Sequence, residues 1–117
     1  MSEGTDVRRG DVVIVRFDPA EGHEMKKTRP AVVVQNDIGN ENSSTTIVAP
    51  ATGTYRGYPF EVLVKTTESP LEEDSSIRLD QIRVVSIKNR IHSVTGSLDT
   101  ETMEAVDDAL KLSLGLD

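Results

Sequence analysis

The chemically richest part of the chain is residues 18–35, DPAEGHEMKKTRPAVVVQ, a polar and charged loop that leads into an apolar strand. It contains His23, one of the two histidines in the sequence. It also contains the densest group of positive charges, formed by Lys26, Lys27 and Arg29. A histidine can transfer protons near neutral pH, and clustered cations attract anions. Because loops held by a rigid strand often carry function, we expect this loop to form part of a site.

A second pair of residues that could take part in a reaction is Arg78 and Asp80. They lie where the predicted strand at 75–79 leads into the predicted strand at 82–87. Residues two apart in a strand point to the same face, so the two side chains are expected side by side. A guanidinium keeps its charge, and its planar fork fits two phosphate oxygens. A carboxylate can accept a proton or orient a histidine. The alternative for this pair is a simple surface salt bridge.

The composition limits the class of protein. A chain of 117 residues can bury the core of one domain, and the absence of cysteine excludes disulfides and thiolate metal sites. Two separated histidines argue against a zinc site. The net charge of −7 argues against broad binding to nucleic acid, but residues 1–36 contain six acidic and six basic residues, so a local basic patch can exist.

We expect neither a signal peptide nor a membrane-spanning segment in this sequence. The N-terminus lacks the apolar core of a signal peptide. No apolar run approaches the ~20 residues that span a bilayer. We therefore expect a cytoplasmic protein that does not contact the membrane.

The apolar pattern predicts six or seven short strands and then one helix. The strands are expected at residues 11–17, 31–35, 45–49, 60–65, 75–79 and 82–87, with a short last one at 90–94. Residues 36–44 have the composition of turns, and Pro50 is expected to end the third strand. In the fourth strand, alternation places Phe60, Val62 and Val64 on one face and Glu61 on the other.

The last part of the chain predicts a capped amphipathic helix. Asp99 is expected to cap its N-terminus and Gly115 to end it. Its apolar stripe is formed by residues three or four apart, which are Met103, Val106, Leu110 and Leu114. Short, closely spaced strands favour a small antiparallel β-barrel against which the helix packs. We predict a mainly β (α+β) protein, with a flexible lead at residues 1–8 and a single domain at 9–117.

Six stretches of the sequence match one family of proteins. They are RGDVVIVRFDP (9–19), GHEMKKTRP (22–30), VVVQNDIGN (32–40), IVAPATG (47–53), LDQIR (79–83) and TMEAVDDALKLSLGL (102–116). The combination of GxE, TRP and QND-GN is specific. The chain therefore resembles the MazF/PemK (Kid) family of toxin endoribonucleases from type II toxin–antitoxin systems. The resemblance implies an SH3-like antiparallel β-barrel with a C-terminal α-helix, and a homodimer.

The resemblance also implies an activity. Such proteins are sequence-specific mRNA interferases, which cleave single-stranded RNA without a metal or a cofactor. Attack by the ribose 2′-OH gives a 2′,3′-cyclic phosphate (or a 3′-phosphate) and a 5′-OH end. A cognate antitoxin inhibits the toxin, and the toxin–antitoxin complex binds DNA. The alternative is a non-catalytic toxin of the same fold that binds a protein target such as gyrase.

The two branches of the family imply two sets of catalytic residues. The MazF-type pattern matches at Arg29 and Thr52, and the Kid/PemK-type pattern matches at His23, Arg78 and Asp80. The arginines suit phosphate and transition-state charge, and a threonine hydroxyl can donate to a phosphate oxygen. His23 and Asp80 suit proton transfer, with the acid and the base unassigned between them.

Further side chains are expected to bind RNA. They are Glu24, Lys26, Lys27, Thr28, Tyr55, Arg56 and Gln81. Tyrosine and arginine side chains can stack on unpaired bases. The two lysines either steer RNA, hold the antitoxin, or only keep the loop soluble. Tyr58 and Phe60 are further candidates for stacking, unless Phe60 is a core residue.

Overall fold

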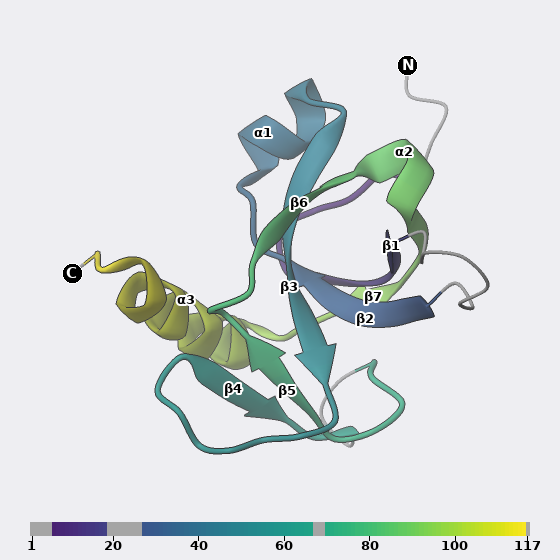
Figure 1. The fold of residues 1–117 in the computed structure, drawn as a ribbon. Helices are drawn as coiled ribbons and strands as arrows, with labels where there is room; N and C mark the ends of the chain where they lie inside the picture. The colour runs from purple at the N-terminus through teal and green to yellow at the C-terminus, as the bar shows by residue number, and fades with distance from the viewer. Residues whose placement is uncertain (1–5, 19–26, 67–69, 117) are drawn as a thin grey trace.

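The computed structural model describes residues 6–18, 27–66 and 70–116, and antiparallel strands are the most common element of this part of the chain (Figure 1). The strands are β1 (Asp11–Asp18), β2 (Lys27–Val33), β3 (Thr45–Thr52), β4 (Glu61–Val64), β5 (Ser75–Arg78), β6 (Arg83–Ser86) and β7 (Ile91–Ser97). The helices are α1 (Asp37–Asn42), α2 (Ile87–Arg90) and α3 (Thr100–Leu114). The prediction of a mainly β protein with a C-terminal helix is confirmed.

Strand β3 lies at the centre of the sheet. The hydrogen-bonded order is β4-β5-β3-β2-β1-β7, an open path, and β6 also pairs with β3. One edge of β3 pairs with β2. Its other edge pairs first with β6, through residues 45–48, and then with β5, through residues 51–52. This change of partner joins the two parts of the sheet and places β5 beside the C-terminal end of β3 (Figure 1).

The prediction that Pro50 ends the third strand is wrong. Strand β3 continues to Thr52, and Pro50 is in register with Ala31 of β2. On the other edge, Pro50 falls between the residues paired with β6 and those paired with β5. Its missing N–H therefore removes no ladder bond to a described strand on that edge. The longer strand carries Thr52 into register with Ser76 of β5.

Residues 36–44 also differ from the prediction, because they form helix α1 instead of turns alone. The Asn36 side chain accepts a hydrogen bond from the Gly39 N–H at 2.8 Å and caps this helix, and Asp37 lies in its first turn. Asparagine and aspartate favour both turns and helix N-termini, so composition alone does not separate the two. The short helix α2, capped by Ser86, was likewise not predicted.

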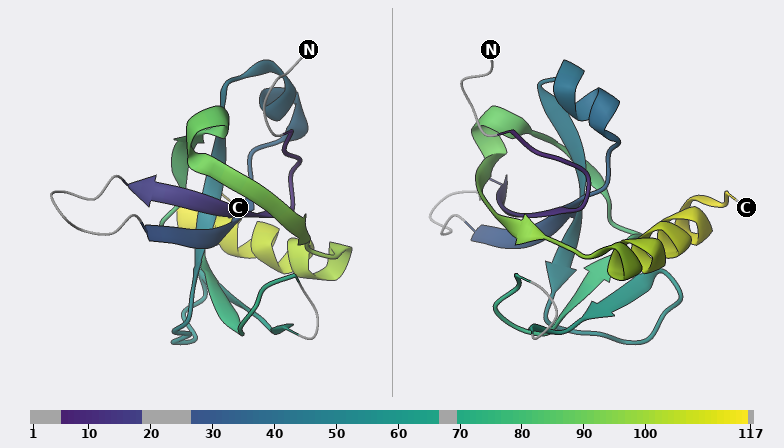
Figure 2. Two further views of the ribbon diagram at one scale, coloured as in Figure 1. Left: turned by 90° about the vertical axis from the view of Figure 1, so that its right-hand side faces the viewer. Right: turned by 180° about the vertical axis from the view of Figure 1, so that it is seen from behind.

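Helix α3 packs on one face of the sheet beside β4 (Figure 2). As predicted, Asp99 accepts a hydrogen bond from the Thr102 N–H at 2.8 Å, and Gly115 ends the helix with a left-handed φ of 74°. Val106 is fully buried, but Leu114 is 51% exposed, so the predicted stripe is correct only in part. No helix in the described part of the chain is long and apolar enough to cross a membrane.

Two apolar clusters lie on opposite sides of the sheet. The cluster under α3 contains Val12, Val32 and Ile77, and the other contains Val13, Val33 and Val48. Neighbouring residues of β1 and of β2 thus enter different clusters, as alternation along a strand requires. The strands that hold the candidate residues are therefore fixed by packing on both faces.

Candidate functional site

Arg29 and Thr52 lie at neighbouring strand positions. Strand β2 begins at Lys27, so Arg29 belongs to the strand, in register with Val15 of β1, and not to the preceding loop. Its side chain is exposed and has no hydrogen-bond or ion-pair partner among the described residues. The register of β2 and β3 pairs Ala31 with Pro50. Continued by two residues, this register places Arg29 opposite Thr52.

Two hollows meet at Arg29 and Thr52, and both side chains line each of them. The first has a volume of about 740 Å³ and includes Ala51 on its apolar side and Glu72 and Glu73 before β5. The second, of about 660 Å³, is lined in addition by Phe17, Pro50, Gln81, Ile82 and Arg83. Both volumes fall in the range of ligand pockets, about 300–1,000 Å³. A cation and a hydroxyl are thus placed where a ligand could bind.

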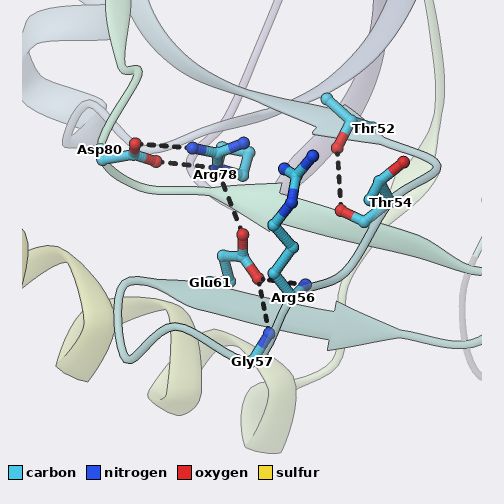
Figure 3. A network of polar contacts seen from close by, with 7 residues as sticks. All are labelled: Thr52, Thr54, Arg56, Gly57, Glu61, Arg78 and Asp80. Atoms are coloured by element: carbon cyan, nitrogen blue, oxygen red, sulfur yellow. Dashed lines mark hydrogen bonds and ion pairs between the residues drawn. The ribbon is translucent and has the colours of Figure 1, made fainter.

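Arg78 and Asp80 form a bidentate pair, as the same-face prediction expects (Figure 3). Arg78 donates from Nε to Oδ1 at 2.9 Å and from Nη2 to Oδ2 at 2.8 Å. These hydrogen bonds hold the pKa of Asp80 below its ordinary value, and they raise the pKa of Arg78. Both groups are therefore charged at neutral pH.

Glu61 is the residue of this site that sequence reasoning missed. It is in register with Arg78, its side chain is fully buried, and its Oε2 lies 3.6 Å from Arg78 Nε. Its Oε1 accepts hydrogen bonds from the backbone N–H groups of Arg56 and Gly57, at 2.9 and 3.0 Å (Figure 3). The predicted alternation places Glu61 on the same outer face of β4 as Leu63, which is 42% exposed, but Glu61 itself is buried. The opposing basic residue could not be paired with it before the strand register was known.

Aromatic rings lie beside the arginines. Tyr58 and Phe60 stack with centroids 5.1 Å apart, and the Arg78 guanidinium lies 5.7 Å from the Phe60 ring centre. Phe60 thus contacts the site instead of being only a core residue. A second pair was not predicted, in which the Arg83 guanidinium lies 5.1 Å from the Phe17 ring centre, beside the second hollow.

The remaining predicted residues are partly outside the described structure. His23, Glu24 and Lys26 lie outside the described residues, as does the side chain of Lys27. The others are exposed. Thr28 lines the first hollow and Gln81 the second, Arg56 belongs to the turn held by Glu61, and Tyr55 precedes that turn in the sequence. Among the described residues, no three His, Asp or Glu side chains are grouped so that they could hold a metal ion.

The two halves of the predicted site share one face of the sheet. Thr52 is in register with Ser76, and Arg78 lies two residues further along β5, on the same face. Arg29 follows on the neighbouring strand β2. The fold and site therefore define a small antiparallel β protein with a C-terminal helix and an arginine-rich cleft suited to an anionic ligand.

Comparisons with known proteins identify the family. Residues 8–114 match the family described as PemK-like, MazF-like toxin of type II toxin-antitoxin system. Endoribonuclease MazF of Staphylococcus saprophyticus subsp. saprophyticus is 39% identical over 112 residues, which cover 94% of this chain and 92% of the relative. The chain therefore belongs to the PemK-like, MazF-like toxin family, and it is a homologue of endoribonuclease MazF.

Solved structures show the same fold. An endoribonuclease from mycobacterial species, in complex with its cognate antitoxin, superposes with a TM-score of 0.79 at 24% identity, covering 95% of this chain and 97% of that one. MazF from Deinococcus radiodurans superposes with a TM-score of 0.75 at 24% identity, covering 96% and 99%. At these identities the likeness establishes the fold alone.

Proposed function

We propose that the protein is a sequence-specific endoribonuclease toxin that cleaves single-stranded RNA, such as mRNA, without a metal ion or a cofactor. Family membership supports the class of activity. The observation that carries the proposal to this chain is the position of Arg29 and Thr52, which line both hollows and whose strand positions put them on the same face of the sheet as Arg78, the partner of Asp80.

The proposed reaction is an internal transesterification. The ribose 2′-oxygen attacks the neighbouring phosphorus while a base takes its proton. The bond from phosphorus to the 5′-oxygen breaks, and an acid protonates that oxygen. The products are a 2′,3′-cyclic phosphate and a 5′-OH end, and addition of water can open the cyclic phosphate to a 3′-phosphate. Charge accumulates on the phosphoryl oxygens in the transition state, so cations and hydroxyl donors at that point accelerate the reaction.

We assign the phosphoryl oxygens to Arg29 and Thr52. Arg29 is exposed, and its guanidinium is free of partners among the described residues, so its fork is available to a phosphate. The Thr52 hydroxyl makes only a long contact of 3.5 Å with the Thr54 carbonyl and can turn to a better acceptor. Arg78 adds positive charge next to them, although Asp80 occupies one side of its fork.

We assign proton transfer to Asp80 and His23. Asp80 is ionised at neutral pH and can accept the 2′-OH proton, although its two hydrogen bonds from Arg78 lower its pKa and so weaken it as a base. His23, in the GHE motif, would then supply the proton to the leaving 5′-oxygen. The assignment of His23 rests on the family motif.

We also propose an assembly for this toxin. Leu112 and Leu114 in the last turn of α3 and Leu116 after it are exposed apolar side chains, and we propose that a homodimer contact covers part of them. We further propose that the 9–117 domain closes as an SH3-like barrel. A cognate antitoxin would inhibit it by covering the cleft around Arg29, and the joint complex would bind DNA. A structural relative is known in complex with its antitoxin, which supports this part of the proposal.

The test is incubation of the purified protein with a long single-stranded RNA in EDTA, followed by chemical identification of the fragment ends. Cleavage at one short sequence supports the proposal. A folded protein that cuts no RNA would instead favour a toxin that binds a protein target.

A further inference from the structure

One buried carboxylate connects two parts of the proposed site. Glu61 Oε1 accepts two successive backbone N–H groups, from Arg56 and Gly57, and Oε2 faces Arg78 Nε at 3.6 Å. The side chain has no exposed surface. A buried charge is costly unless it is compensated, so these contacts must be in place when the protein is folded.

The segment 53–60 is shaped to hold this carboxylate. Gly57 has a φ of 81°, in the left-handed region that favours glycine. Successive N–H groups in such a turn form a concavity that binds an anion, and Glu61 fills it. The Glu61 N–H also donates to the Tyr58 carbonyl at 2.9 Å, which closes the turn. The conformation of the segment thus depends on an anion at this point.

The same segment presents Arg56 on the side of β5 that bears Arg78. Its side chain extends away from Glu61, and in the view of Figure 3 its guanidinium lies between Arg78 and Thr52. Arg56 is exposed, and among the described residues only its backbone has a polar partner. An available cation next to a cleft for an anionic polymer can bind a phosphate.

We propose that Glu61 is a positioning residue of the RNA site, which fixes the 53–60 segment so that Arg56 reaches a phosphate of the bound RNA. This inference rests on the proposed function. Glu61 itself does not touch RNA, since it is buried. It acts through Arg56, and its contact with Arg78 sets where the segment lies relative to the Arg78–Asp80 pair.

The first test uses the free protein and needs no RNA. In Glu61→Ala, the amide hydrogens of Arg56 and Gly57 lose their acceptor, so their exchange measured by NMR should accelerate at least about tenfold. In Glu61→Gln the amide oxygen can still accept both hydrogen bonds, so their protection should be largely retained. Thr46→Val is the control, because Thr46 is buried and bonded to Asn40 at 2.6 Å, away from this segment. It should lower stability without selective exchange at Arg56 and Gly57.

The second test measures binding of a 2′-O-methyl oligoribonucleotide, which cannot be cleaved because its 2′-oxygen is blocked. Arg56→Ala and Glu61→Ala should each weaken binding about tenfold, the worth of one charge-assisted hydrogen bond. The double variant should bind no more weakly than either single one, and Glu61→Gln should bind within about twofold of the wild type.

Two results would overturn the proposal. One is unchanged exchange of the Arg56 and Gly57 amides in Glu61→Ala. The other is multiplication of the two binding losses in the double variant, which would show that Glu61 and Arg56 act independently. If the wild type neither binds nor cuts RNA, the proposed function fails and this positioning role toward RNA fails with it. If the wild type binds and cuts RNA but either of these two results is obtained, the proposed function stands and only the positioning role of Glu61 fails.

Discussion

Arg78 donates two hydrogen bonds to Asp80, at 2.9 and 2.8 Å, so one side of its guanidinium is occupied before any substrate arrives. Glu61 adds a second carboxylate at 3.6 Å. Arg29 is exposed and has no such partner among the described residues. From the sequence, both arginines are expected to have the same role, but their surroundings differ. We therefore expect Arg29 to bind phosphate and Arg78 to hold the carboxylates of the site in place.

Replacement of Arg29 tests the phosphate-binding role. Arg29→Ala should weaken RNA binding about tenfold and lower the cleavage rate further, because a charge-assisted hydrogen bond to the phosphate is lost. Binding of a blocked RNA and cleavage of the natural one should be measured together. Lys88→Ala, which removes an exposed cation from α2, is the control and should change neither. Normal values for Arg29→Ala would make this side chain structural.

Thr52 can be tested with two variants of similar size. Thr52→Val removes the hydroxyl and should lower the rate of cleavage about tenfold or more, with little change in stability, since a donor to the transition state is lost. Thr52→Ser keeps the hydroxyl and should retain most of the activity. Equal rates for the two variants would contradict a role of the hydroxyl in the reaction.

Arg78→Ala should lose both activity and stability. It leaves Glu61 buried without its counter-charge, which should cost about 1–3 kcal/mol of the free energy of unfolding. Cleavage should fall by orders of magnitude. Arg78→Lys keeps the charge but cannot form the fork to Asp80, so it should recover stability better than activity. Denaturant unfolding and single-turnover cleavage measure the two effects, and a fully active Arg78→Ala would remove this residue from the mechanism.

The Arg78–Asp80 pair also predicts a dependence of stability on pH. The pKa of Asp80 in the folded protein is lowered from 3.8 by the Arg78 hydrogen bonds. The stabilisation is therefore complete above that ordinary value and is lost as the pH falls through the lower, folded pKa. Unfolding of Asp80→Asn and wild type should be compared from about pH 6 to about pH 3. The difference between them should shrink toward acid, and a constant difference would contradict the assignment.

His23 predicts the pH dependence of the rate. Asp80 is ionised across the neutral range, so a change of rate near pH ~6.5 should come from the histidine. His23→Gln should slow cleavage and flatten the profile there. His92, which is exposed on β7, provides the matched control His92→Gln. If the cleavage rate of His23→Gln still changes with pH near ~6.5, His23 is excluded as the acid.

The sequence predicted those features that depend on local patterns. The pattern of apolar residues predicted the positions of most strands, and Asp99 and Gly115 predicted the two ends of α3. Family motifs marked Arg29, Thr52, Arg78 and Asp80 as candidate catalytic residues, and the structure confirms only that Arg78 and Asp80 pair. The last two are two apart in the chain, so their pairing could be expected. Residues 36–44 were misjudged because the same side chains favour turns and helix caps.

Features that depend on strand register could not be predicted in this way. Glu61 stands in an apolar strand, and only its position opposite Arg78 and under the Arg56–Gly57 turn accounts for its burial. Proline usually ends a strand, but Pro50 lies within β3, at the point where β3 changes its partner from β6 to β5. The pairing of Glu61 with Arg78 and the pairings of β3 join residues that are far apart in the sequence, so a single sequence contains no direct sign of them.

The most direct test of the central claim is the identification of RNA fragment ends after incubation of the wild-type protein with a long single-stranded RNA in EDTA. We predict discrete cuts at one short sequence, with 5′-OH ends and 2′,3′-cyclic phosphate or 3′-phosphate ends, and markedly slower formation of the same cuts with Arg29→Ala. Intact RNA after incubation with the folded protein, across many sequences, would contradict the account. So would cuts that leave 5′-phosphate ends, because attack by the 2′-OH cannot produce them.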